Sequence, residues 1–246
     1  MMKGFDRPLK PTWIYNCLQL INIGDNISEF KEDFNALLWE LDGKEGKKKV
    51  RTVLYRNFLR SYENPKSRYV EYTPMIGLCK KFPLEKIQPI LLFYLIIRSE
   101  TLLEISKMIH DIYGKRDEIK YPFLLTKVIE RFGDRNISGK SLRNFLRTLV
   151  SFQILKTDDY KSFTWVKQKT ASDFVYCHLL KLYSEELKRS SQINLNDLED
   201  YIFQYYKLPE IKTLANKYHN MLWEYKIRLG DDVLVFHSDY SWESLK

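Results

Sequence analysis

SGKSLRNFLRTLVSFQILKTDDYKSFTWV, residues 138–166, contains the order of elements that decides the fold. Its first half is spaced as an amphipathic helix with Ser138 at the N-cap position. The apolar face consists of Leu142, Phe145, Leu146 and Leu149. A polar turn follows at 156–162, and 163–166 is rich in β-forming residues. Another helix is expected at 121–132, just before this stretch. Helix, turn, helix and a short two-stranded ribbon is the order of a winged helix-turn-helix.

Upstream of this stretch the apolar residues recur at helical spacing, and no segment alternates as a strand does. Helices are predicted over 26–41, with Ser28 as N-cap, and over 48–60, 75–82, 84–98 and 101–113. We therefore expect a mainly α protein, with a helical N-terminal half followed by the winged helix. The expected domains are a helical domain at 1–115, the winged helix-turn-helix at 116–170, and a helical region at 171–246.

The C-terminal region repeats part of this pattern when the chain is shifted by 73 positions. Leu125, Ile129, Leu149 and Ile154 meet the identical residues Leu198, Ile202, Leu222 and Ile227. One interpretation is a second winged-helix-like unit, built from 194–206, 209–225 and 233–236. The other is two ordinary helical hairpins that each end in a strand. The sequence leaves both open.

Composition narrows the class of protein. The 246 residues have a formal charge of +8, which is compatible with a nucleic-acid partner. Only 9 glycines and 8 prolines are present, which disfavours doubly wound nucleotide-binding folds and all-β sandwiches. Three cysteines without a paired spacing disfavour a disulfide scaffold and a zinc finger. No secretory signal is recognised, and the longest apolar run, 90–97, is too short for a bilayer. We expect a cytoplasmic protein without a membrane partner.

The candidate recognition surface lies on the helix that begins near Ser138. Lys140, Arg143, Asn144 and Arg147 follow the spacing i, i+3, i+4, i+7 and share the face opposite the apolar one. Arginine donates to guanine or phosphate, asparagine pairs with adenine, and lysine adds a mobile cation. Lys156 and Lys161 in the predicted ribbon are expected to reach neighbouring phosphates. The alternative is a solvated cationic helix face.

Two other polar surfaces carry weaker signals. Lys48, Lys49 and Arg56 form a second basic cluster, which is either a further DNA contact or a solubilising surface. The helix expected at 209–225 has more polar than basic side chains, so a protein-docking or purely structural role is favoured for it.

Local signatures of catalysis are missing from the sequence. It contains no phosphate-binding glycine loop, no dinucleotide fingerprint and no nucleophile elbow. The four histidines have no metal-ligand spacing. Asp158-Asp159 and Asp231-Asp232 fall at predicted hairpin tips, where aspartate is favoured by turn geometry. We therefore expect no enzyme, no metal and no cofactor, although a convergent site without a local motif is a third hypothesis.

The layout resembles the BrxA family of the bacterial BREX phage-defence systems. The segments concerned are KVRTVL (49–54) with Arg56 and Leu59-Arg60, LLFYL (91–95) before Arg98-Ser99, and SGKSLRNFL (138–146) before Phe152 and Ile154-Leu155. The resemblance covers about residues 28–166. It implies double-stranded DNA binding within a multi-protein defence system, and no catalytic residues.

Two functions follow from these observations. The first is a non-enzymatic DNA-binding protein that uses the helix from Ser138 as its recognition helix. The second is a protein–protein adaptor that docks through winged helices in a multi-protein complex. In that case the aromatic residues near the C-terminus, Trp223, Tyr240 and Trp242, would cover a partner.

Overall fold

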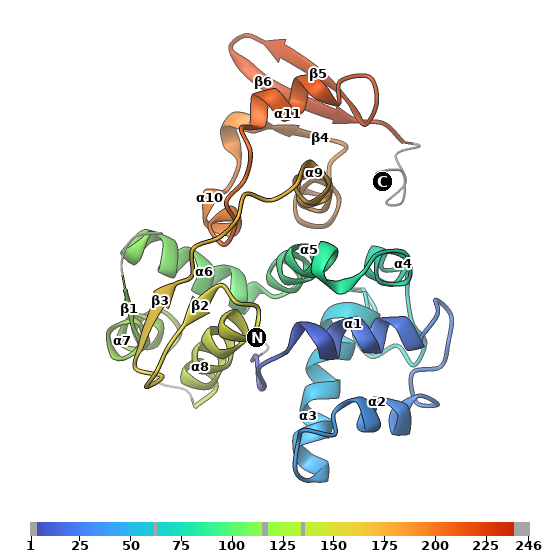
Figure 1. Cartoon of the computed structure of the whole chain (residues 1–246), viewed down its shortest axis with the longest axis vertical. Coiled ribbons are helices and arrows are strands. Elements are labelled where there is room, and N and C mark those ends of the chain that lie inside the picture. Colours follow the sequence, from blue (N-terminus) through green and yellow to red (C-terminus); the bar gives the residue numbers. More distant parts are fainter. Residues whose placement is uncertain (1–3, 62, 115–117, 134–135, 239–246) are drawn as a thin grey trace.

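The computed structural model describes residues 4–61, 63–114, 118–133 and 136–238. The chain is mainly helical, as expected. Its N-terminal half contains α1 (Pro11–Leu20), α2 (Lys31–Leu37), α3 (Lys44–Leu54), the π-helix η1 (Tyr55–Leu59), α4 (Pro74–Lys81), α5 (Leu84–Ile97) and α6 (Glu100–Tyr113). The helices α4, α5 and α6 form a central layer, with α1, α2 and α3 on one side of it (Figure 1).

Helix α5 lies at the centre of the molecule. Leu91, Leu92, Phe93 and Leu95 are fully buried, because α1, α4, α6 and α9 (Asp173–Leu182) pack around the helix. A helix that is apolar on all sides requires cover on all sides, and these neighbours supply it. Within the described parts of the chain, no helix is both long and apolar enough to span a bilayer.

A first unit with its own small sheet follows α6. It comprises β1 (Ile119–Lys120), α7 (Tyr121–Phe132), α8 (Asn136–Ser151), β2 (Leu155–Lys156) and β3 (Ser162–Trp165). The antiparallel sheet has the order β1-β3-β2, with Ile119 opposite Phe163 and Leu155 opposite Trp165. The four apolar residues predicted for the inner face of α8 are all fully buried.

A second unit has the same order of elements. After α9 and the π-helix η2 (Tyr183–Lys188) come β4 (Gln192–Asn194), the 3-10 helix η3 (Leu195–Asp197), α10 (Asp200–Phe203), α11 (Ile211–Lys217), β5 (Trp223–Arg228) and β6 (Asp231–Phe236). The strand order β4-β6-β5 corresponds to β1-β3-β2, and β4 begins 73 residues after β1. The 73-residue shift found in the sequence therefore relates the first unit to the second, whose helices and strands follow in the same order. Figure 1 shows the second unit above the central layer and the first unit beside it.

Several predicted boundaries were wrong. The helix expected over 26–41 is reduced to α2, because Asn26 forms a β-bridge with Tyr69 and holds the chain extended. The helix expected over 209–225 ends at Lys217, since β5 begins at Trp223 and pairs with β6. Ser138 is not an N-cap: α8 begins at Asn136, and the Ser138 hydroxyl donates to the Gly133 carbonyl at 3.3 Å.

Candidate nucleic-acid interface

Three of the four predicted recognition residues form an exposed line on α8. Lys140, Arg143 and Arg147 are all exposed, whereas the opposite face of the helix is buried in the core. Their spacing of three and four residues places them one above the other along the helix. We name these three residues the α8 stripe. Among the described residues, no carboxylate lies within ion-pair distance of any of them.

Two tyrosines hold the arginines of the stripe. The Arg147 guanidinium lies 4.9 Å from the ring centre of Tyr160, and that of Arg143 lies 5.8 Å from the ring centre of Tyr121. Such cation–π contacts restrict a guanidinium without consuming its N–H groups, although Arg143 also donates to the Tyr121 hydroxyl at 3.5 Å. Sequence reasoning missed both tyrosines. The sequence signal for Tyr160 was a large aromatic residue within an otherwise polar turn. In the structure its side chain is half exposed.

The loop between β2 and β3 is ordered by its own side chains. One oxygen of Asp159, Oδ1, accepts from the amides of Lys161 and Ser162 at 2.8 and 3.0 Å. These donors lower the pKa of the Asp159 carboxyl. Lys156 and Lys161, the two predicted phosphate contacts, are both exposed, but Asp158 and Asp159 balance their charge. The net positive charge of this surface therefore comes from the α8 stripe, and the aspartates serve the turn.

Asn144 differs from the expectation. It is only 9% exposed, and its Nδ2 donates to the carbonyl of Phe5 at 2.9 Å. The N-terminal segment 4–10 runs along this side of α8, where the Phe5 amide donates to Ser141 and the Leu9 amide to Thr148. Asn144 therefore anchors the N-terminal segment. The i, i+4 spacing shows on which side of a helix a residue lies, but not whether another segment covers that side. Here a segment 139 positions away covers it.

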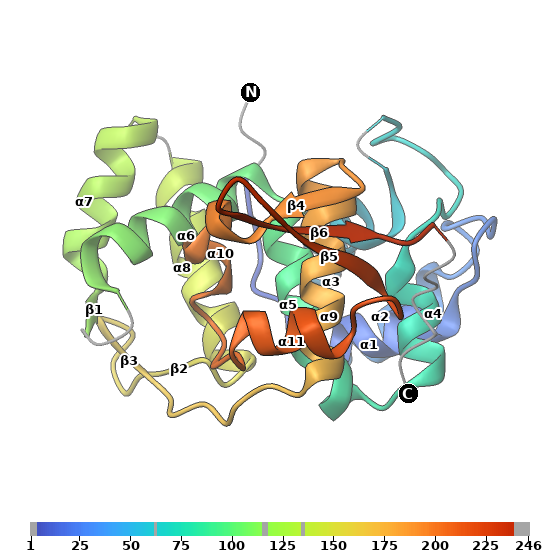
Figure 2. The ribbon, with the colours of Figure 1, turned by 90° about the horizontal axis from the view of Figure 1, so that it is seen from above.

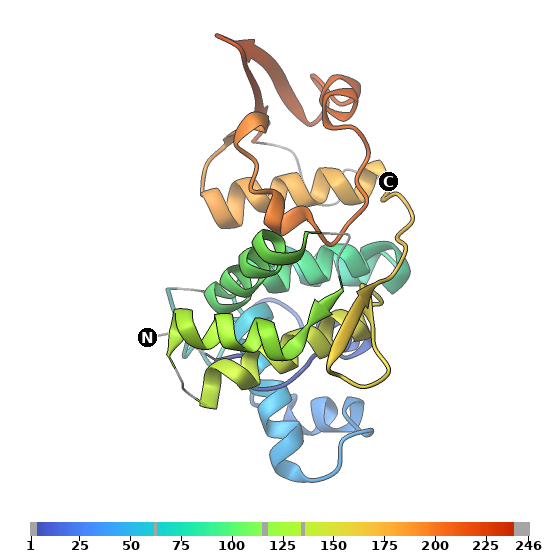
Figure 3. The same cartoon turned by 90° about the vertical axis from the view of Figure 1, so that its left-hand side faces the viewer.

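The second predicted basic cluster is not joined to the α8 stripe. Lys48 and Lys49 are exposed on α3, which Figures 1 and 3 show apart from α8. Arg56 lies in η1 and points inward, where it donates to the Gly4 carbonyl at 2.8 Å. Burial lowers the pKa of its guanidinium. Arg56 thus holds the N-terminal segment at Gly4, next to the Phe5 carbonyl that Asn144 contacts, and it is not a free surface cation.

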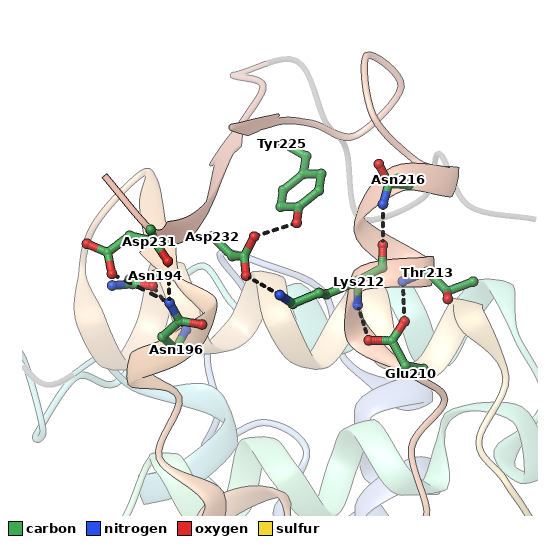
Figure 4. A network of polar contacts seen from close by, with 10 residues as sticks. Asn194, Asn196, Glu210, Lys212, Thr213, Asn216, Tyr225, Asp231 and Asp232 are labelled. Atoms are coloured by element: carbon green, nitrogen blue, oxygen red, sulfur yellow. Dashed lines mark hydrogen bonds and ion pairs between the residues drawn. The ribbon is translucent and has the colours of Figure 1, made fainter. Parts of the chain in front are cut away.

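The equivalent helix of the second unit shows a contrasting arrangement (Figure 4). Lys212 of α11 forms an ion pair of 2.7 Å with the buried Asp232, which also accepts from the Tyr225 hydroxyl at 2.6 Å. These partners lower the pKa of Asp232 and raise the pKa of Lys212. Lys217 pairs with Asp173 at 2.5 Å. The cations of α11 are therefore neutralised within the protein, while those of the α8 stripe are not.

The aromatic residues proposed for partner docking are placed only in part. Trp223 is fully buried, and its indole N–H donates to the Ala215 carbonyl at 2.9 Å, so it is a core residue and not a docking residue. Tyr240 and Trp242 lie outside the described residues. Within the described residues, no group of three or more His, Cys, Asp and Glu side chains is close enough to hold a metal ion.

Comparison with known proteins adds no relative to this description. No protein-family model, no curated protein and no solved structure matches the chain.

Proposed function

We propose that the protein is a non-enzymatic DNA-binding protein in which the first unit acts as a winged helix-turn-helix. In this proposal α8 is the recognition helix, and the loop between β2 and β3 is the wing. The observation that carries it is the α8 stripe, three exposed cations on one helix with no carboxylate partner among the described residues. The first unit's strand order β1-β3-β2 and its helix–helix–hairpin order support the same interpretation.

The chemistry of the stripe fits a duplex. A phosphate backbone attracts cations whose charge is not already neutralised, and binding releases the counterions condensed on the DNA. Arg143 and Arg147 present planar donor groups that match a phosphate or a guanine edge, and the tyrosine contacts reduce the entropy lost when they bind. The buried apolar face of α8 keeps the helix in place while its outer face enters a groove.

The proposal is tested by fluorescence anisotropy with a labelled duplex and the double variant Arg143→Ala, Arg147→Ala. A matched control is Lys66→Ala, Arg68→Ala, which removes the same charge from two exposed residues in the loop between η1 and α4. We expect the stripe variant to bind at least tenfold more weakly and the control to bind nearly as well as the wild type. Equal loss in both variants would show that only total charge matters, and retained affinity in the stripe variant would refute the assignment.

A second candidate function, a protein–protein adaptor, is favoured by one observation in the second unit. At the tip of the β5–β6 hairpin, Leu229 is fully exposed and Ile227 is 72% exposed. Leu229 also has a φ of +49°, followed by Gly230 at +89°, a turn in which asparagine is preferred over leucine. An apolar side chain at a position that disfavours it is typical of a contact surface. If this tip docks on a partner, Leu229→Asn weakens that complex without changing duplex affinity.

The resemblance to the BrxA family, and with it a place in a multi-protein phage-defence system, stays a prediction. Duplex binding by the α8 stripe is consistent with it, but the proposal does not depend on it.

A further inference from the structure

A groove of about 500 Å³ lies where the first unit joins the rest of the molecule. One wall is the linker 166–172 between β3 and α9, and the other comprises the start of α5 and Lys207. We name it the linker groove. Figures 2 and 3 show the linker running from the end of β3 to the start of α9, along the side of the molecule that carries the β2–β3 hairpin.

The linker groove is cationic. Four lysines line it, Lys86, Lys167, Lys169 and Lys207, against the single carboxylate of Glu85. Lys167, Lys169 and Lys207 are exposed, and no ion pair involves any of them within the described part of the chain. Lys86 is held in place, because its ammonium lies 4.1 Å from the ring centre of Phe174. The remaining polar lining consists mostly of neutral amide and hydroxyl side chains, several of which already donate within the protein, such as Gln88 to the Phe152 carbonyl and Tyr206 to the Pro89 carbonyl. The positive charge of the groove therefore comes from its lysines.

Backbone hydrogen bonds fix the walls. Thr170 and Lys207 form a parallel β-bridge, and the Ala171 amide donates to the Lys207 carbonyl at 2.7 Å. The Gln168 side chain donates to the Gln153 carbonyl at 3.0 Å, which ties the linker to the end of α8. Three lysines are therefore presented from an ordered frame, and little backbone entropy remains to be lost when an anion binds.

The linker groove lies at the C-terminal end of α8, the helix that carries the stripe. Gln153, one of its lining residues, comes two residues after α8 ends. From Lys140 to the end of the helix is about 17 Å, at 1.5 Å per residue. The hairpin leads to the groove as well, because β3 runs from Ser162 to Trp165, about 10 Å, and Lys167 follows two residues later. A duplex bound along the stripe would have to extend past the end of α8 to reach the groove.

We propose that the linker groove binds the phosphodiester backbone of the same duplex, beyond the segment that the α8 stripe contacts. This inference rests on the proposed function and extends it, because it predicts a binding site longer than one winged-helix unit needs. Arginine side chains, with their base-reading geometry, are absent from the lining, and lysines that act as point charges are present. The groove should therefore contribute affinity and not sequence preference.

The test compares wild-type protein with the variant Lys167→Ala, Lys169→Ala, Lys207→Ala on duplexes of about 11 and 22 base pairs, one and two helical turns. Both proteins should bind the short duplex alike. On the long duplex the wild type should bind more tightly than the variant, and its plot of log affinity against log salt should be steeper by about 2.7, at 0.9 for each phosphate contact. A longer duplex offers more positions at which the protein can bind, which raises the apparent affinity of both proteins equally. Comparing the two proteins on the same duplex removes this effect.

The outcomes separate this inference from the function on which it rests. If the stripe variant loses binding to both duplexes while the groove variant binds both like the wild type, the proposed function stands and the groove proposal is wrong. If the wild type binds neither duplex, both fail. If the groove variant instead loses binding to poly-glutamate with duplex affinity unchanged, the occupant is an acidic peptide, which also overturns the proposal. A circular dichroism spectrum equal to that of the wild type verifies that the groove variant is folded.

Discussion

Replacing Asn144 by alanine separates the two roles that neighbouring residues of α8 play. The Asn144 side chain is buried, and its Nδ2 donates to the Phe5 carbonyl at 2.9 Å. Alanine removes this donor and leaves the carbonyl of a fully buried residue without its partner, which costs about 1–3 kcal/mol. The higher helix propensity of alanine offsets roughly 0.5 kcal/mol of this cost. The free energy of unfolding should therefore fall by about 0.5–2.5 kcal/mol.

A loss of this size is measurable by thermal unfolding. For a chain of this length it corresponds to a fall in Tm of about 1–10 °C. The affinity of the folded variant for a duplex, measured well below its Tm, should equal that of the wild type. Arg143→Ala is the matched control one residue away, because this exposed side chain should change stability by no more than about 0.5 kcal/mol. It should weaken duplex binding by about fivefold or more.

The opposite pattern would refute this reasoning. If Asn144→Ala keeps the wild-type Tm and weakens duplex binding, then Asn144 faces the ligand and the N-terminal segment does not cover this side of α8. If Arg143→Ala lowers the Tm as much as Asn144→Ala does, the α8 stripe belongs to the folded core.

Three further predictions concern the two units. Asp232→Asn should flatten the pH dependence of stability in acid, which urea unfolding at several pH values measures. Lys212 and Tyr225 hold the pKa of Asp232 below its unfolded value. The contribution of Asp232 to the free energy of unfolding is therefore present above about pH 4 and is lost as the pH falls through the lower folded pKa. Phe145→Ala should cost about 3–5 kcal/mol in chemical unfolding, because the ring is fully buried against Tyr205 on the inner face of α8; a loss below 1 kcal/mol would contradict this packing. Leu229→Asn should raise stability by up to about 1 kcal/mol in the same assay, since asparagine tolerates the positive φ at this hairpin tip; a clear loss would mean that the leucine side chain packs on the protein.

The periodic segments of the chain were predictable from the sequence. Helices α4 to α8 lie close to their predicted ranges, because each contains apolar residues at helical spacing over a sufficient length. The fully buried apolar face of α8 is confirmed for the same reason. The 73-residue shift was detectable from a few apolar identities, and the two strand orders now give it a structural counterpart.

What the sequence could not provide depends on contacts between distant segments. Nothing local shows that residues 4–10 cover one side of α8, so Asn144 and Arg56 were both assigned to the surface. Helical spacing likewise cannot show that Asp232 neutralises Lys212 across the second unit, or that Tyr160 contacts Arg147 from a loop. The linker groove is formed by segments 85–89, 152–153, 166–175 and 206–207, which no sequence window contains together.

The salt dependence of duplex affinity tests the central claim most directly. The measurement compares wild-type protein with the variant Lys140→Ala, Arg143→Ala, Arg147→Ala on a labelled duplex of about 11 base pairs, between about 50 and 200 mM salt. If the α8 stripe contacts three phosphates, the variant binds more weakly and its slope of log affinity against log salt is shallower by about 2.7. Equal affinities and equal slopes in a folded variant would contradict the account.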